Sequence, residues 1–167
     1  KHVLCEKPLG CNAQEAQEMT AAARASGRLL KTGFNHRHHP AIRQAHQLYA
    51  EGAIGEALVV RCIYGHGGRP GYEHEWRGDP ELAGGGELLD QGVHGLDLCR
   101  WFMGEFAAVF GRTATSFWPI GPLEDNAFAL LWTRQGQVAS LHTSWTQWRN
   151  RFEFEVIGRD GMVRVEG

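Results

Sequence analysis

The pattern of apolar residues changes near residue 35, and this change limits the folds that the chain can adopt. Before it, residues 2–5 and 29–34 are short apolar runs on either side of the alanine-rich stretch 13–25. Asn12 with Glu15 three residues later is typical of a capping box, and Gly27 suits a helix end. The order strand, helix, strand predicts one βαβ unit of a parallel sheet.

The remaining chain predicts a different class of fold. A helix is expected from Pro40 to about Tyr49, a strand over 57–64, a long loop over 65–86 and a helix over 87–103. Further strands are expected over 106–117, 126–134, 137–147, 151–158 and 162–166. Tight turns at Gln135-Gly136 and Asp160-Gly161 favour an antiparallel sheet. We therefore predict an α+β chain with two domains, residues 1–34 and residues 35–167.

Charge and cysteine content exclude several classes of partner. The formal net charge is -2, from 17 basic and 19 acidic residues, so neither nucleic acid nor an anionic membrane is expected as a partner. No apolar run approaches the roughly 18 residues that a membrane span needs, and no signal peptide pattern is visible. The four cysteines form no C-x-x-C pair, which favours reduced thiols in a cytoplasmic protein.

The segment from Gly84 to Asp97 carries the strongest chemical signal. Three glycines precede a predicted helix in which Asp90 and His94 are four residues apart, with Asp97 on the same stripe. A histidine beside a carboxylate is suited to general acid/base work, because its unperturbed pKa is about 6.5. The spacing is equally compatible with an amphipathic helix whose Asp and His only face water.

Two other polar groups are weaker candidates. Glu6-Lys7-Pro8 follows the first predicted strand, and ligands of parallel α/β sheets bind at the carboxyl ends of strands, although a solvated charged turn also fits. The histidines at 36, 38, 39, 66 and 74 are compatible in principle with a metal. No H-E-x-x-H motif is present and adjacent histidines do not share a helix face, so no metal site is predicted.

Together these motifs resemble the Gfo/Idh/MocA family, named for glucose–fructose oxidoreductase and inositol dehydrogenase. Glu6-Lys7-Pro8 is similar to the family's E-K-P motif, and Gly33 to Arg37 followed by Pro40 is similar to the segment that leaves its Rossmann domain. Gly84 to Asp97 resembles its G-G-G-x-L-x-D-x-G-x-H-x-x-D helix. The three blocks occur in the family's order and span nearly the whole chain.

The resemblance implies a fold and a reaction. Residues 1–34 would be the βαβ tail of a Rossmann fold, and the rest a mostly antiparallel open sheet covered by helices on one face. The reaction would be hydride transfer between NAD or NADP and a hydroxyl carbon of a sugar, inositol or related polyol. The open sheet face would join copies of the chain into a dimer or tetramer.

The resemblance also implies roles for individual residues. His94 would be the general base, Lys7 would polarise the reacting hydroxyl, and Asp90 would position the substrate. The cofactor-binding residues would be Glu6, Lys7 and Pro8. The substrate-binding residues would be Asn35, Arg37, Trp76, Arg77, Asp90 and His94. Lys7 beside His94 would oppose protonation of the imidazole and keep it free to act as a base at neutral pH.

Family members begin with a strand and a glycine-rich turn that bind the dinucleotide, and this sequence contains neither. We therefore expect the 167-residue chain to be catalytically silent alone. Three alternatives stay open at this stage. They are a glycosidase that uses NAD and returns it unchanged, a non-catalytic assembly module, and, much more weakly, a metal hydrolase.

Overall fold

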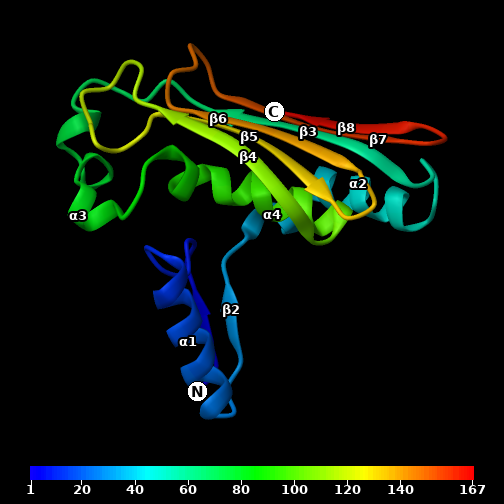
Figure 1. Cartoon of the computed structure of the whole chain (residues 1–167), viewed down its shortest axis with the longest axis horizontal. Coiled ribbons are helices and arrows are strands. Elements are labelled where there is room, and N and C mark those ends of the chain that lie inside the picture. The colour runs from blue at the N-terminus through cyan, green and yellow to red at the C-terminus, as the bar shows by residue number, and fades with distance from the viewer.

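The computed structural model describes all residues, 1–167, and contains two separate sheets (Figure 1). The strands are β1 (Val3–Cys5), β2 (Leu30–Thr32), β3 (Ala57–Gly65), β4 (Phe106–Ala114), β5 (Asn126–Thr133), β6 (Val138–Ser144), β7 (Arg151–Gly158) and β8 (Met162–Glu166). The α-helices are α1 (Ala13–Ala25), α2 (Pro40–Ala50), α3 (Pro80–Ala83) and α4 (Val93–Met103). No helix is both long and apolar enough to cross a membrane.

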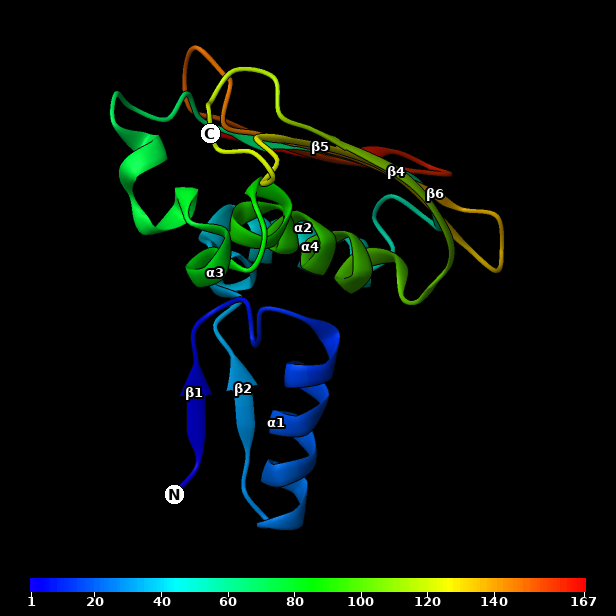
Figure 2. The ribbon, with the colours of Figure 1, turned by 60° about the vertical axis from the view of Figure 1, so that its left-hand side comes forward.

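Residues 1–34 form the predicted βαβ unit, which extends away from the larger sheet (Figure 2). Strands β1 and β2 are parallel, with Val3 opposite Leu30 and Cys5 opposite Thr32. Helix α1 begins as predicted, because the Asn12 side chain accepts a hydrogen bond of 2.9 Å from the Glu15 backbone N–H. We call residues 1–34 the N-terminal unit; none of them is buried.

The larger sheet has six strands in the order β4-β5-β6-β3-β7-β8. Its neighbouring strands are antiparallel except for β3 and β6, which are parallel, so the prediction of a mostly antiparallel open sheet is confirmed. Strand β3 lies between β6 and β7, which are consecutive in sequence. Residues 145–150 cross over β3, a span of about 10 Å at the usual strand spacing. No tight-turn signal marked that crossing in the sequence.

Helices α2 and α4 cover one face of this sheet (Figure 1). Their apolar sides and the inward-facing strand residues form the main core, which includes Ile42, Val60, Leu98, Leu141 and Phe154. The opposite face carries no helix and exposes Phe110, Phe128 and Leu130. The prediction that helices cover a single face is therefore confirmed.

Three predicted segments differ in detail from the structure. The expected loop 65–86 contains the short 3-10 helices η2 (Tyr72–His74) and η3 (Trp76–Gly78) and helix α3. The helix expected over 87–103 starts as a π-helical turn, η4 (Leu88–Gly92), and continues as α4. Strand β4 ends at Ala114 rather than at residue 117, because buried Asp125 accepts hydrogen bonds from the backbone N–H groups of residues 116, 117 and 118.

Candidate active site

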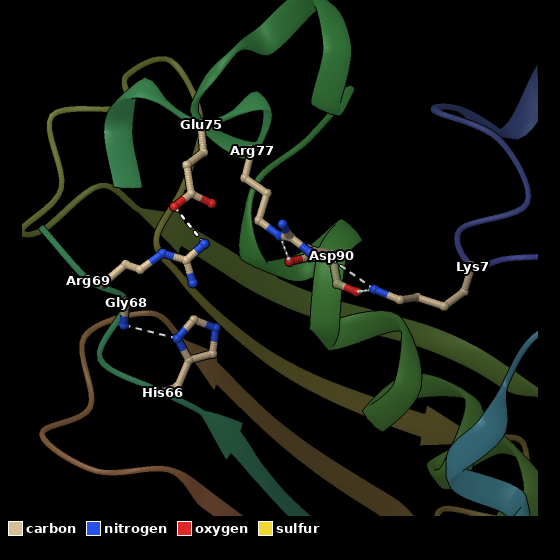
Figure 3. A network of polar contacts seen from close by, with 7 residues as sticks. All are labelled: Lys7, His66, Gly68, Arg69, Glu75, Arg77 and Asp90. Carbon is tan, nitrogen blue, oxygen red and sulfur yellow. Dashed lines mark hydrogen bonds and ion pairs between the residues drawn. The ribbon is translucent and has the colours of Figure 1, made fainter. Parts of the chain in front are cut away.

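Lys7 of the N-terminal unit, Arg77 of η3 and Asp90 of η4 form an ion-pair network (Figure 3). Lys7 Nζ lies 2.9 Å from Asp90 Oδ1 and also donates to the Asp90 backbone oxygen, and Arg77 Nε lies 2.9 Å from Asp90 Oδ2. Burial alone would raise the pKa of Asp90, but the hydrogen bonds and charges of Lys7 and Arg77 outweigh burial and lower it. Asp90 is therefore a carboxylate with a cation on each oxygen.

A cavity of about 310 Å³ surrounds this network. Six of the residues singled out from the sequence line it: Glu6, Lys7, Pro8, Trp76, Arg77 and Asp90. Ala83, Gly85, Leu89 and Trp145 are also in its wall. Glu6, Lys7 and Pro8 directly follow β1, and the other lining residues belong to the larger domain, so the cavity lies where the N-terminal unit meets that domain.

His94 lies one helical turn beyond Asp90, and its side chain is buried. Burial, followed by the charges of His36 and Lys7, lowers the pKa of His94 to about 4, although Asp90 acts in the opposite direction. His94 Nδ1 is buried without a hydrogen-bond partner. The imidazole is therefore neutral at neutral pH, and His94 is not among the residues that line the cavity.

Two other predicted residues lie on η1 (Asn35–His38), the 3-10 turn that follows the N-terminal unit. Arg37 forms two hydrogen bonds to Asp97 on α4, from Nε at 2.6 Å and from Nη2 at 2.5 Å. Asn35 begins the turn and does not line the cavity of the Lys7–Asp90 network. The Arg37 guanidinium therefore links η1 to α4 through Asp97. The contact of Arg37 with substrate stays a prediction.

The glycines of the motif have steric reasons to be there. Gly84 has a φ of +71°, and a Cβ on it would lie 2.5 Å from Cys11 Cβ in the N-terminal unit. A Cβ on Gly86 would lie 2.0 Å from the backbone oxygen of Glu124. The Glu124 carboxylate accepts from the N–H groups of Gly86 and Leu88 and so caps the start of the helix. The glycines allow both the N-terminal unit and the Glu124 loop to approach.

The sequence reasoning missed Glu87, which is fully buried at the start of this helix. Burial, and then the charge of Asp90, raises the pKa of Glu87 to about 9, and neither carboxyl oxygen has a hydrogen-bond partner. A signal was present, because Glu87, Gln91, His94 and Leu98 follow the 4-3-4 spacing of a helix stripe that faces a core. That stripe includes fully buried Leu98 and was overlooked because three of its members are polar.

The sequence reasoning also gave no role to His36, whose ring lies flat on that of His94 with centroids 4.0 Å apart. The other histidines of the candidate metal cluster do not converge with it. His66, for example, accepts a hydrogen bond from the Gly68 backbone N–H (Figure 3). No group of three or more His, Cys, Asp or Glu side chains has an arrangement that could hold a metal ion.

Comparison with known proteins places both parts of the chain. Residues 42–164 match the GFO/IDH/MocA C-terminal domain, and residues 1–34 match the NAD-binding Rossmann fold of an oxidoreductase family. Levoglucosan dehydrogenase of Pseudarthrobacter phenanthrenivorans is 34% identical over 81% of the chain and 35% of its own length. The 1,5-anhydro-D-fructose reductase of Ensifer adhaerens is 33% identical over 98% of the chain and 49% of its own length.

The fold agrees with these matches. A solved structure of levoglucosan dehydrogenase in complex with NADH and levoglucosan superimposes with a TM-score of 0.90 at 30% identity, over 98% of the chain and 47% of that protein. The chain thus spans about half the length of such relatives. With matches to both family models, and with the sheet and glycine-rich helix described above, the chain belongs to the GFO/IDH/MocA family of oxidoreductases.

Proposed function

We propose that this chain is the substrate-binding and catalytic part of an NAD(P)-dependent enzyme that oxidises a hydroxyl carbon of a sugar, inositol or related polyol. The observation that carries the proposal is the meeting of Lys7, Asp90 and Arg77 around one cavity, one turn from a neutral, buried His94. Neighbouring ionisable side chains whose pKa values are shifted by burial and by charged partners are typical of catalytic sites.

In the proposed reaction His94 takes the proton of the substrate hydroxyl. Its low pKa keeps the imidazole neutral, so the base needs no prior deprotonation at neutral pH. The Lys7 ammonium draws electron density from the same hydroxyl and favours its ionisation. Asp90 holds Lys7 by its carboxylate and backbone oxygen, which fixes the ammonium relative to the base.

The cofactor would supply the acceptor for the hydride when bound. Glu6, Lys7 and Pro8 line the cavity at the carboxyl end of β1, which is where parallel α/β sheets bind dinucleotides. These residues therefore fit a nicotinamide group, and the match of residues 1–34 to an NAD-binding Rossmann fold supports the assignment.

The lining of the cavity suits a polyhydroxylated substrate. Trp76, which is 51% exposed, offers aromatic surface for the C–H side of a sugar ring, whereas Arg77 and Asp90 offer charged partners for its hydroxyls. Trp76 also lies against the Arg77 guanidinium, whose carbon is 4.3 Å from the ring centroid. We therefore propose Trp76 and Arg77 as substrate contacts.

The test is polyol-dependent formation of reduced nicotinamide by the full-length protein that contains this chain. His94→Ala should lower kcat by about 100-fold or more, the usual scale of general base catalysis. His46→Asn is the matched control, because His46 packs on Trp101 and lies outside the cavity. Near-normal turnover of the His94 variant would disprove the assigned base. Release of free sugar without net reduced nicotinamide would indicate a glycosidase instead.

We also propose that the helix-free face of the sheet joins copies of this chain. Phe110 is 71% exposed and Phe128 is 47% exposed, although both are large apolar residues of adjacent strands. An apolar patch of this kind marks an interaction surface. Sedimentation should show a dimer or tetramer that Phe128→Glu converts to monomer, and a monomeric parent chain would contradict the proposal.

A further inference from the structure

The 3-10 turn η1 contacts α4 at two adjacent points. His36 stacks on His94, and Arg37 pairs with Asp97, three residues further along the same helix. Adjacent residues of the turn thus meet positions i and i+3 of α4, which lie on one face of a helix. Because η1 directly follows the N-terminal unit, this contact joins that unit to the helix that carries the proposed base.

The ring of His36 is itself held on three sides. It lies flat on His94 with an interplanar angle of 8°, and its centroid is 5.2 Å from Tyr64 of β3 and 5.7 Å from Phe152 of β7. The His94 ring also packs against Phe34 in a T-shaped arrangement, with the two ring centroids 6.0 Å apart. Aromatic neighbours on this many sides leave the His36 ring little freedom to tilt.

We propose that His36 is a positioning residue for His94. Its flat contact fixes the plane of the His94 imidazole, and any proton on His36 opposes a proton on His94. This inference rests on the proposed role of His94 as the base, and it adds a residue that acts through the base without touching the substrate.

The charged groups around the two histidines determine how each ring changes the pKa of the other. His36 faces His39, Lys7 and Asp97, and His94 faces Lys7 and Asp90. Burial, then His39 and Lys7, lowers the pKa of His36, whereas Asp97 acts in the opposite direction. Two imidazoles 4.0 Å apart bind their second proton less readily than their first, so removing one ring should raise the pKa of the other.

The first experiment needs no catalytic activity. Histidine ring resonances of the 167-residue chain are followed by NMR during a pH titration, and the His94 signal is assigned from His94→Asn. In His36→Phe, which keeps an aromatic ring without a charge, the His94 midpoint should rise by about one pH unit. His46→Asn should leave the midpoint in place. An unchanged His94 midpoint in His36→Phe would overturn the inference.

The second experiment separates the ring's support from its charge in the full-length enzyme. His36→Ala should lower kcat about tenfold more than His36→Phe, with a smaller change in KM, because only alanine leaves the His94 ring unsupported. The acid limb of the kcat/KM profile should move to higher pH in both variants. Equal kcat in the two variants would refute the positioning role. An inactive parent enzyme would refute the proposed function. The NMR titration would still test the coupling between His36 and His94, because it needs no activity.

Discussion

The N-terminal unit and the six-stranded domain contribute to the same site but are stabilised in different ways. The domain has a core of 16 buried residues between its sheet and its helices. The N-terminal unit has no buried residue, yet it supplies Lys7, one of the three proposed catalytic groups. One region therefore has its own source of stability, and the other depends on a few contacts made at the site itself.

Those contacts combine structure with chemistry. Lys7 binds Asp90, Cys11 packs against Gly84, and the chain continues from β2 directly into η1. Breaking an ion pair at a partly buried position costs more than breaking one in full solvent, because it leaves a charge poorly hydrated, and Lys7 and Asp90 are only 17% and 11% exposed. We therefore infer that the Lys7–Asp90 pair helps to hold the N-terminal unit in place as well as arranging charge at the site.

The largest expected effect is on the stability of the six-stranded domain, which contains the core. Glu87 keeps its proton in the folded protein up to a pH of about 9, whereas in the unfolded chain it loses it near pH 4.5. Glu87 therefore costs stability increasingly as pH rises from about 4.5 to 9. Glu87→Gln should match the parent near pH 4.5 and be more stable by about 3 kcal/mol at pH 7.

Urea denaturation at both pH values measures this difference. Glu81→Gln is the control, because Glu81 is an exposed carboxylate on α3 and its replacement should have no such pH dependence. A constant difference between the Glu87 variant and the parent at the two pH values would show that Glu87 is ionised in the folded domain. Burial of Glu87 would then not lower the free energy of unfolding as pH rises.

The next effect tests the contact between the regions. Asp90→Asn removes the carboxylate that holds Lys7 and Arg77, which should weaken docking of the N-terminal unit by about 1–3 kcal/mol. Amides of β1 and β2 should then exchange hydrogen roughly 10 to 100 times faster, while those of β3 keep their rate. Glu105→Gln breaks an exposed ion pair with Arg100 and should change neither set. Equal acceleration in β3 would mean that the two regions open together.

The smallest effect lies within the N-terminal unit. Asn12→Ala removes the side-chain cap of α1 and should cost that helix about 1 kcal/mol. Because α1 buries no residue, exchange of its amides should rise a few fold without a shift in the main thermal transition. A fall in the main transition temperature would contradict the independence of the two regions.

Local signals explain why much of the fold was predictable. Asn12 and Glu15 marked the start of α1, and the glycine-rich block marked the helix that carries Asp90 and His94. These features depend on residues close together in sequence. The placement of β3 beside β6, and the stack of His36 on His94, depend on segments brought together by the whole fold. The spacing of residues in the sequence does not predict these long-range contacts.

The candidate site shows the same division. Six of the candidates that the family resemblance implied line one cavity, whereas Asn35, Arg37 and His94 do not. The pairing of Arg37 with Asp97 was not predicted, because both residues were read as single members of separate motifs. Glu87 was missed for another reason: acidic side chains are rarely fully buried, and its position on the buried helix stripe was overlooked.

The π-helical turn at Leu88–Gly92 has a consequence for how this segment tolerates change in length. A π turn accommodates one residue more than an α turn, and each residue advances a helix by roughly 100°. Losing a single residue within this turn would therefore leave an ordinary α turn with the flanking helix in register, whereas inserting one would rotate the residues before it relative to α4. At this turn a single deletion is therefore a milder change in length than a single insertion.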